Sequence, residues 1–594
     1  MLQENKLIEL NQRKAVTAIA EDHLHLHREM LERCEADYNE ELCMLTVELV
    51  SRGHHTNLKT GSKVHPTRES IVYAAALLEG GTNPCRAADI IRKVISLQDV
   101  EPGSTFGLWS YNYEEPLAEM SPPDWNWADF IGKMLAYIML YHRDSVENVS
   151  PGITDLIRGA LERACKCIIK RDASVTYTNI CVMDIYCTII AGELLDDSEV
   201  YRYGEQKLNA FMEFTKICNN YEMQEYNSPT YTMVAAEDIH RIVQDTSSLA
   251  VKEKAEEVNR WLWQCIGEHY HAGTRQWGGP QGRCYNEFFH GAATYKLALA
   301  TDGFIKATPK IEPDTYIMAP SCPTECLDLF KEHTNLKKRI RKGFCYPWFD
   351  PCVTDTTYSE EKFTIGSFNR SELWNQIRPL TAYVRVDEDV VRVRVQVLHD
   401  FYDYSSANLH CVQHKANILG HVGFSVDRGD THINLDMIDG SIHAKDMRLR
   451  VSIESESGRE FSPIAEENGF SMLLGEVSLS FYLAECSFGA FAPKCEIGGE
   501  SGKTWFDVVL YSGELRELDF TSMNEAYAVF VLWMTQTSVQ FNMPSVIKER
   551  GHVRSRWETD GVQLENITRV RPDKFCCMLS DSVQLINGKA IEEG

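Results

Sequence analysis

Helical periodicity dominates the first half of the chain. Between Trp127 and Tyr141, apolar residues recur at the spacing of one helix face, which predicts an amphipathic helix. Similar segments follow at short intervals, separated by turns of Gly, Pro, Asn or Asp and without strand patterns: 70–78, 87–97, 153–169, 179–195, 199–218, 230–243, 249–269 and 285–299. Successive helices of this kind pack as a bundle, a solenoid or a closed ring. Because no strict repeat period is visible, the pattern favours an α/α toroid.

Strand-like alternation takes over in the second half. The segment Val391–Val397 alternates valine with a polar residue at every step, which predicts one buried and one solvent-facing side. The other expected strands are short and bounded by turn residues: 381–386, 390–397, 420–426, 447–453, 477–483, 504–511, 526–533 and 574–579. Many short strands in succession predict a large antiparallel β-sandwich.

The length supports a division into domains. A single hydrophobic core rarely grows beyond about 250–300 residues, and this chain has 594. We expect a multidomain α and β protein: a helical (α/α) toroid in 1–310, a proline-containing connector in 311–362, and an antiparallel β-sandwich in 363–594.

Charge and composition exclude several classes of function. The net charge of −26 argues against a nucleic-acid-binding surface, which needs clustered Lys and Arg, but a local basic site can still bind one acid group. The N-terminal residues lack the apolar core of a signal peptide, and no apolar run long enough to span a membrane is apparent. These patterns predict a cytoplasmic protein without membrane association.

Cysteines and cofactor motifs point to no bound group. The 19 cysteines lie mostly in apolar segments, and no CxxC pair has a matching second pair. We therefore expect free, mostly buried thiols and no metal. Neither a dinucleotide fingerprint nor a P-loop is present, so no cofactor is expected.

The segment Glu225–Tyr231 carries the strongest chemical signal. Ser228 and Pro229 suit the N-cap and the first position of a helix, which places Asn227 beside a helix N-terminus that favours anions. Tyr231 follows in the first turn. An amide and a phenol at this place suit a sugar that bears a carboxylate, with Asn227 near the acid and Tyr231 as a proton-transfer group. A capped helix start with a buried tyrosine would give the same pattern.

A second segment, Trp277–Tyr285, combines glycines with groups that bind sugars. Arg283 can pair with a carboxylate through two hydrogen bonds, Trp277 can stack on a sugar ring, and Tyr285 is a second phenol. His290, expected on the following helix, is a candidate acid or base. A loop between helices is the alternative interpretation.

Three further segments mix aromatic with polar residues and are expected to bind substrate. Glu115, Trp125 and Asn126 lie in the stretch 109–127, and Asn179 ends the segment Tyr177–Asn179 at the start of a predicted helix. The stretch 366–378 opens the β-rich part of the chain with Asn369, Arg370, Trp374 and Gln376. Loops between elements explain the same residues without substrate.

At these motifs the chain resembles the heparinase II/III-like polysaccharide lyases and related toroid-plus-sandwich carbohydrate-active proteins. The similarity rests on Tyr226–Tyr231, Tyr177–Asn179, Gly279–Arg283 and the stretch 366–378. It implies a lyase that cleaves a uronate-containing oligosaccharide or polysaccharide by β-elimination. In such lyases an Asn or Arg neutralises the carboxylate, a Tyr or His is the base and a Tyr is the acid.

Two other functions fit the same sequence. A glycoside hydrolase would need two carboxylates, for which the candidates are Glu115, Asp124, Asp184 and Glu225. A sugar-binding protein without catalysis would keep the aromatic residues and lack converging Tyr, His, Arg or acid groups. Fold alone does not decide among these functions.

Overall fold

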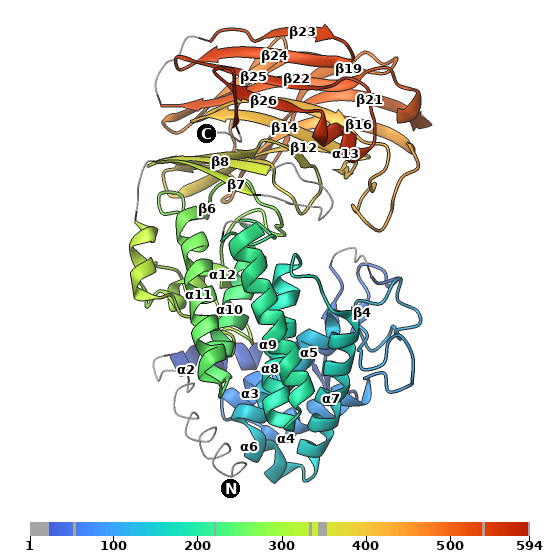
Figure 1. Cartoon of the computed structure of the whole chain (residues 1–594), viewed down its shortest axis with the longest axis vertical. Helices are drawn as coiled ribbons and strands as arrows, with labels where there is room; N and C mark the ends of the chain where they lie inside the picture. Colours follow the sequence, from blue (N-terminus) through green and yellow to red (C-terminus); the bar gives the residue numbers. More distant parts are fainter. Residues whose placement is uncertain are drawn as a thin grey trace. The chain divides into compact units, whose positions relative to one another are not determined.

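The computed structural model describes Ile19 and residues 23–50, 55–218, 221–331, 335–341, 353–536 and 541–591. The chain forms two compact units whose segments alternate along the sequence (Figure 1). The helical unit comprises 1–215, 232–264 and 290–327, and the β unit comprises 216–231, 265–289 and 328–594.

The helical unit is built from antiparallel helix pairs. Its helices are α2 (Leu24–Ala36), α3 (Thr67–Glu79), α4 (Pro84–Ser96), α5 (Trp127–Tyr141), α6 (Arg143–Val149), α7 (Ile153–Arg171), α8 (Thr178–Leu195), α9 (Ser198–Glu213), α10 (Pro229–Asp245), α11 (Leu249–His269) and α12 (Ala292–Ala300). The predicted helices are present, and α2 and α6 are additional. Short hairpins such as β1 (Tyr38–Asn39) with β2 (Met44–Leu45) also occur, although no strand was predicted here.

Polar and packing contacts between helices join the helical unit into a closed ring. Lys133 of α5 pairs with Asp238 of α10 at 3.0 Å, and Lys296 of α12 pairs with Glu237 of α10 at 2.9 Å. The segment after α12 returns to α2, where Arg33 donates to the carbonyl of Ile311 at 3.0 Å. Helix α2 in turn packs on α3, which contacts α5. The helical unit therefore closes on itself, as the predicted toroid requires.

Helix α8 corrects one expectation. By length and composition it could cross a membrane, yet 83% of the stretch is buried inside the structure. The sequence did not suggest such a run because Asp184 and Glu193 interrupt it. Since α8 packs between α5 and α9, an apolar surface on all sides follows from packing alone.

The β unit contains three layers of antiparallel strands. The nine-stranded sheet contains β7 (Asn335–Arg341), β8 (Val353–Glu360), β9 (Phe363–Phe368), β11 (Leu380–Val386), β12 (Asp389–His399), β13 (Tyr402–Asp403), β16 (Ser441–Ser455), β20 (Lys494–Glu500) and β21 (Lys503–Asp519). The seven-stranded sheet contains β10 (Ser371–Glu372), β14 (Ala407–His414), β15 (Asn417–Phe424), β17 (Ile464–Glu466), β18 (Gly469–Leu474), β19 (Val477–Phe488) and β22 (Ala526–Thr535). The five-stranded sheet contains β23 (Ser545–Glu549), β24 (His552–Thr559), β25 (Val562–Arg569), β26 (Val583–Ile586) and β27 (Lys589–Ala590).

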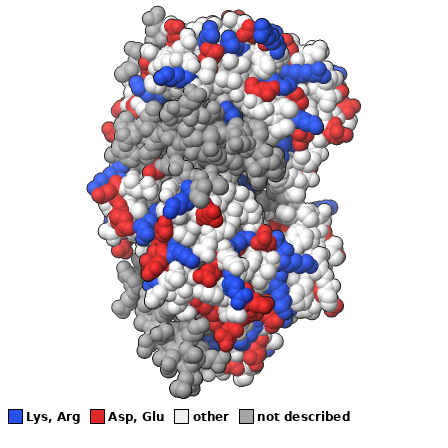
Figure 2. Space-filling model, viewed as in Figure 1, with Lys and Arg blue, Asp and Glu red and all other residues white. Residues whose placement is uncertain are grey.

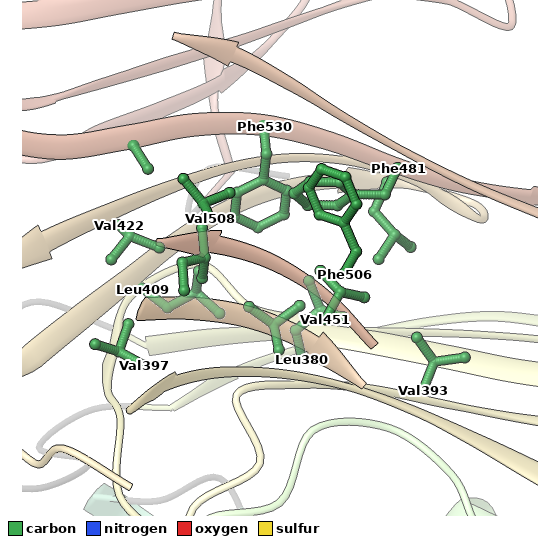
Figure 3. Close-up of a cluster of buried hydrophobic side chains, with 14 of the residues drawn as sticks. Leu380, Val393, Val397, Leu409, Val422, Val451, Phe481, Phe506, Val508 and Phe530 are labelled. Carbon is green, nitrogen blue, oxygen red and sulfur yellow. The ribbon is translucent and has the colours of Figure 1, made fainter. Parts of the chain in front are cut away.

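The main core lies between the nine-stranded and seven-stranded sheets (Figure 3). Phe506 of β21 meets Phe481 of β19 at 5.4 Å between ring centroids, across the two sheets. Strand β22 shows why the middle sheet is buried on both sides: Phe530 faces this core, while Val529 and Val531 face the five-stranded sheet. Alternate residues of a strand point to opposite faces, so β22 has no solvent-facing side.

Strand β12 departs from the predicted alternation. Its valines enter the main core as expected, but the opposite face is buried too, since Arg392 is 2% exposed and Arg394 is 4% exposed. These arginines are held in ion pairs with acidic side chains of the same unit. A buried ion-pair network gives the same sequence pattern as a solvent-facing side.

Three local predictions need correction or adjustment. Residues 574–579 form the short helix α13 (Phe575–Ser580) instead of a strand, and its first residue donates its N–H to Asp427 at 2.8 Å. The helix predicted from residue 285 begins only at Ala292, because Gly291 has a φ of 63°. The predicted connector contains β7 and β8, while its residues 342–352 lie outside the described part of the chain.

Candidate functional site

The start of α10 positions Tyr231. The Ser228 hydroxyl accepts the backbone N–H of Tyr231 at 3.0 Å, and Pro229 is the first helical residue. This is the N-cap arrangement that the sequence predicted. Tyr231 therefore lies in the first turn of a helix whose direction is fixed by the cap.

Asn227 joins this helix start to the loop that follows α11. Its Nδ2 donates to the carbonyls of Gly278 and Pro280 at 2.8 and 2.9 Å, and its Oδ1 accepts the indole N–H of Trp277 at 2.5 Å. Asn227 is 5% exposed and Trp277 is 1% exposed. With the amide bonded within the protein and the indole buried, the placement favours scaffolding over the predicted substrate contacts.

The two phenols meet at the guanidinium of Arg283. Tyr231 donates its hydroxyl hydrogen to the Tyr285 oxygen at 2.8 Å. Arg283 Nη2 donates to the Tyr231 oxygen at 3.1 Å, and the guanidinium carbon lies 4.9 Å from the centre of the Tyr231 ring. A cationic donor at a phenolic oxygen stabilises the negative charge left when the proton departs. Tyr285 is 53% exposed, so solvent reaches this group.

Neighbouring side chains hold Arg283 in place. Its Nε donates to Gln376 Oε1 at 3.0 Å, its Nη1 lies 3.5 Å from Glu225 Oε1, and its guanidinium carbon lies 5.5 Å from the Trp374 ring centre. The Arg283 side chain keeps 24% of its surface exposed. The segment 366–378 thus reaches the first two segments through Gln376 and Trp374.

His432 is a residue that the sequence did not single out. Its ring meets the Trp374 ring edge-on at 4.8 Å between centroids, and Trp374 donates its indole N–H to the carbonyl of Thr431 at 3.0 Å. The Asp436 carboxylate accepts the backbone N–H groups of Thr431 and His432 at 2.7 and 2.8 Å. The sequence signal for this arrangement was an acidic residue, Asp436, a few positions after His432 in the same loop.

Asp436 is tuned by the same loop. Burial alone would raise the pKa of Asp436, but the hydrogen bonds from Thr431, His432 and Asp430 outweigh it and lower the pKa. A charged, fully bonded carboxylate gives the loop around His432 one preferred conformation.

Two other residues of the β unit that were predicted to bind substrate make hydrogen bonds within the protein. Asn369 is 3% exposed and accepts the Thr354 N–H at 2.8 Å. Arg370 is 5% exposed and donates to Gln584 Oε1 at 3.1 Å. Both link strands, and this favours a role in folding over a role in binding substrate.

The remaining predicted residues belong to the helical unit. Glu115 is 1% exposed and accepts from the Thr56 hydroxyl and the Asn57 N–H at 2.5 and 2.6 Å. Asn126 precedes α5 and donates to the Tyr177 hydroxyl at 3.1 Å, Trp125 beside it is partly buried, and Asn179 is buried in the first turn of α8. His290 is exposed and lies just before Gly291, outside α12.

The carboxylates needed for a hydrolase are engaged within the protein. Asp184 is fully buried and pairs with Arg171. Burial, followed by the charge of Asp129, raises the pKa of Asp184 well above its ordinary value. Asp124 accepts the Tyr111 hydroxyl at 2.6 Å, and Glu225 faces Arg283. Among the described residues, no group of three His, Cys, Asp or Glu side chains is placed to hold a metal ion.

Comparison with known proteins found one family model that matches part of this chain. Residues 50–297 match the family model described as "Domain of unknown function (DUF8769)". No curated protein matches the sequence. A crystal structure of heparinase III is similar over 94% of this chain and 92% of that chain, with 9% sequence identity and a TM-score of 0.45.

Proposed function

We propose that this protein is a carbohydrate lyase that cleaves a uronate-containing oligosaccharide by β-elimination. The proposal rests on one observation: Tyr231, Tyr285 and Arg283 lie together at a solvent-accessible position of the β unit. These groups supply what the reaction requires: a cation for the carboxylate, a base and an acid.

The proposed reaction moves one proton off carbon and one onto oxygen. Arg283 holds the uronate carboxylate and stabilises the charge that builds on it. Tyr231 acts as a phenolate, its hydroxyl proton having been lost to solvent and its charge being stabilised by Arg283. It takes the proton from the carbon next to the carboxylate, and the electron pair of that C–H bond forms the new carbon–carbon double bond. The C–O bond to the leaving sugar breaks as Tyr285 gives its proton to the departing oxygen. Proton exchange between the two hydroxyls, 2.8 Å apart, then restores the starting state.

Two further groups are candidates for supporting roles. His432, held against Trp374, is a histidine of the β unit that we propose assists proton exchange. His290 stays a prediction from the sequence. Gln376 and Glu225 fix the direction of the Arg283 guanidinium and are positioning residues.

The surface charge favours short substrates. On the described residues of the face drawn in Figure 2, Lys and Arg are interleaved with Asp and Glu. A long polyanion would bind best along a continuous basic stripe. A local cation such as Arg283 is enough for one acid group of a short oligosaccharide.

The test is direct detection of the product. Short uronate oligosaccharides are incubated with the full-length protein, and the ultraviolet absorbance of the unsaturated uronate is followed. A rising absorbance with one new unsaturated end per cleavage supports β-elimination. New reducing ends without that absorbance would support a hydrolase, and binding without either product would support a sugar-binding protein.

A further inference from the structure

Three arginines of the β unit are buried around one carboxylate. Arg378, Arg392 and Arg394 are 3%, 2% and 4% exposed. Burying a guanidinium is costly unless its charge and N–H groups are matched. The carboxylate they share is that of Glu287, whose side chain is 38% exposed.

The three guanidinium groups converge on Glu287 from strand β12 and from the segment before β11. Arg378 Nη2 lies 3.4 Å and Arg394 Nη1 3.5 Å from Glu287 Oε1, and Arg392 Nη1 contacts Glu287 Oε2. Elsewhere in the cluster, Arg392 pairs with Glu454 at 2.9 Å and Arg394 pairs with Asp403 at 2.7 Å. Glu287 is therefore the anion that all three arginines share.

The cluster has more donors than acceptors. Each guanidinium carries five N–H groups, and the Nε atoms of Arg392 and Arg394 are buried without a hydrogen-bond acceptor in the described part of the chain. Burial, and then the charge of Arg394, lowers the pKa of Arg392 to about 10, while burial followed by Arg378 does the same for Arg394. The three guanidinium charges are matched by the carboxylates of Glu287, Glu454 and Asp403, so displacing Glu287 leaves one positive charge in excess.

The cluster lies beside the Tyr231–Arg283 group. The segments 281–287 and 376–378 run against each other: Cys284 N–H donates to the Gln376 carbonyl at 2.6 Å, and Gln281 N–H donates to the Arg378 carbonyl at 2.9 Å. The same two segments carry Arg283 with Gln376 and Glu287 with Arg378. A ligand held at Arg283 would have its neighbouring sugar within the same stretch of protein.

We propose that Arg378, Arg392 and Arg394 form a second anion site, in which a carboxylate or sulfate of the ligand replaces the carboxylate of Glu287. Planar guanidinium groups match both kinds of anion. The exposed side of Glu287 lets solvent, and therefore a ligand, reach the cluster. The site deepens the proposed function by requiring a second acidic group on the substrate, and only the identity of the ligand rests on that function.

The experiment uses the full chain and measures binding of glucuronate and of inorganic sulfate by calorimetry, with glucose as the neutral control. Glu287→Gln keeps the shape of the side chain and removes the competing charge. It should bind at least one of the two anions about tenfold more tightly than wild type, a change of about 1.4 kcal/mol. Glu361→Gln, which removes an exposed charge paired with Arg385, is the matched control and should change nothing. Whether glucuronate or sulfate gains more identifies the source of the acid group.

A second variant keeps the test decisive if Glu287→Gln folds poorly. Arg394→Lys retains the charge but loses the planar fork, and it should weaken anion binding to otherwise wild-type protein about tenfold. Anion affinity that is the same in wild type, Arg394→Lys and Glu287→Gln would mean an adventitious ion only and would overturn the proposal.

The second anion site and the lyase can fail separately. Tyr231→Phe should leave anion affinity within about twofold, because it removes a proton-transfer group rather than a cation. If anion binding depends on Arg394 but no unsaturated product forms, the second anion site is supported and the lyase activity is rejected. If Arg394→Lys forms the unsaturated product with the same rate and KM as wild type, the lyase activity is supported and the second anion site is rejected.

Discussion

Arg283 donates a hydrogen bond to the phenolic oxygen of Tyr231 at 3.1 Å and lies 4.9 Å from its ring centre. These residues are 52 positions apart, and each comes from a segment that the sequence marked for its own reasons. Their contact joins a helix start to a glycine-containing loop, and it gives both residues a shared role in charge stabilisation.

The side chain of Gln376 is expected to affect substrate binding only by orienting Arg283. Gln376→Leu removes the acceptor for Arg283 Nε, so the guanidinium loses its fixed direction while the phenols stay. We expect KM to rise about tenfold and kcat to change by less than about threefold, as for lost binding that is equal in ground and transition states. Gln376→Glu, which keeps the acceptor, should recover most of the affinity. Steady-state kinetics with equal KM in Gln376→Leu and wild type would show that Arg283 needs no such support.

Asn227 should matter for stability first. Asn227→Ala removes the acceptor of the Trp277 N–H and the donors of two carbonyls. Leaving buried polar groups unsatisfied costs about 1–3 kcal/mol each, so the free energy of unfolding should fall by roughly 2–4 kcal/mol. The exposed Asn434→Ala is the control and should change it by less than about 0.5 kcal/mol. Urea titration measures both. An Asn227→Ala protein as stable as wild type but unable to bind substrate would restore the contact predicted from the sequence.

The β unit should be acid-sensitive through a histidine pair. His410 and His421 face each other on β14 and β15, and burial lowers the pKa of both to about 3. The unfolded chain takes up protons below pH of about 6.5 while the folded chain does not. Their contribution to stability is therefore present above pH 6.5 and is lost progressively as the pH falls toward 3.

A variant isolates this effect. His421→Gln cannot take up the proton in either state, so its melting temperature should fall less between pH 7 and pH 4.5 than that of wild type. Calorimetry at a series of pH values measures the two slopes. Equal slopes would show that His421 does not carry the acid sensitivity.

The sequence predicted elements well where a local pattern decides the structure. Trp127–Tyr141 was expected as a helix with the bounds it has, because its apolar periodicity and its burial agree. Residues 574–579 were misassigned because a run of five apolar residues fits a short helix or a strand equally. Arg392 and Arg394 were taken as solvent-facing because alternation reports polarity and not burial.

The candidate site was predictable only in part, for a related reason. Tyr231 and Arg283 stand out because a capped helix start and a glycine-containing loop are local signals. The amide of Asn227 was expected to face substrate, and its partners in the loop 277–280 could not be read from spacing. His432 is a candidate because its ring contacts Trp374, which lies 58 positions away in the sequence. No local sequence pattern indicates such a contact.

The most direct measurement compares wild type with Tyr231→Phe in the ultraviolet assay for unsaturated uronate. Tyr511→Phe, which removes a phenol hydroxyl from β21, is the control. The account predicts that wild type and Tyr511→Phe form the unsaturated product, while Tyr231→Phe loses about 10²–10⁴-fold in rate and keeps its substrate affinity. Activity of Tyr231→Phe within about threefold of wild type, far below the usual contribution of acid–base catalysis, would contradict it.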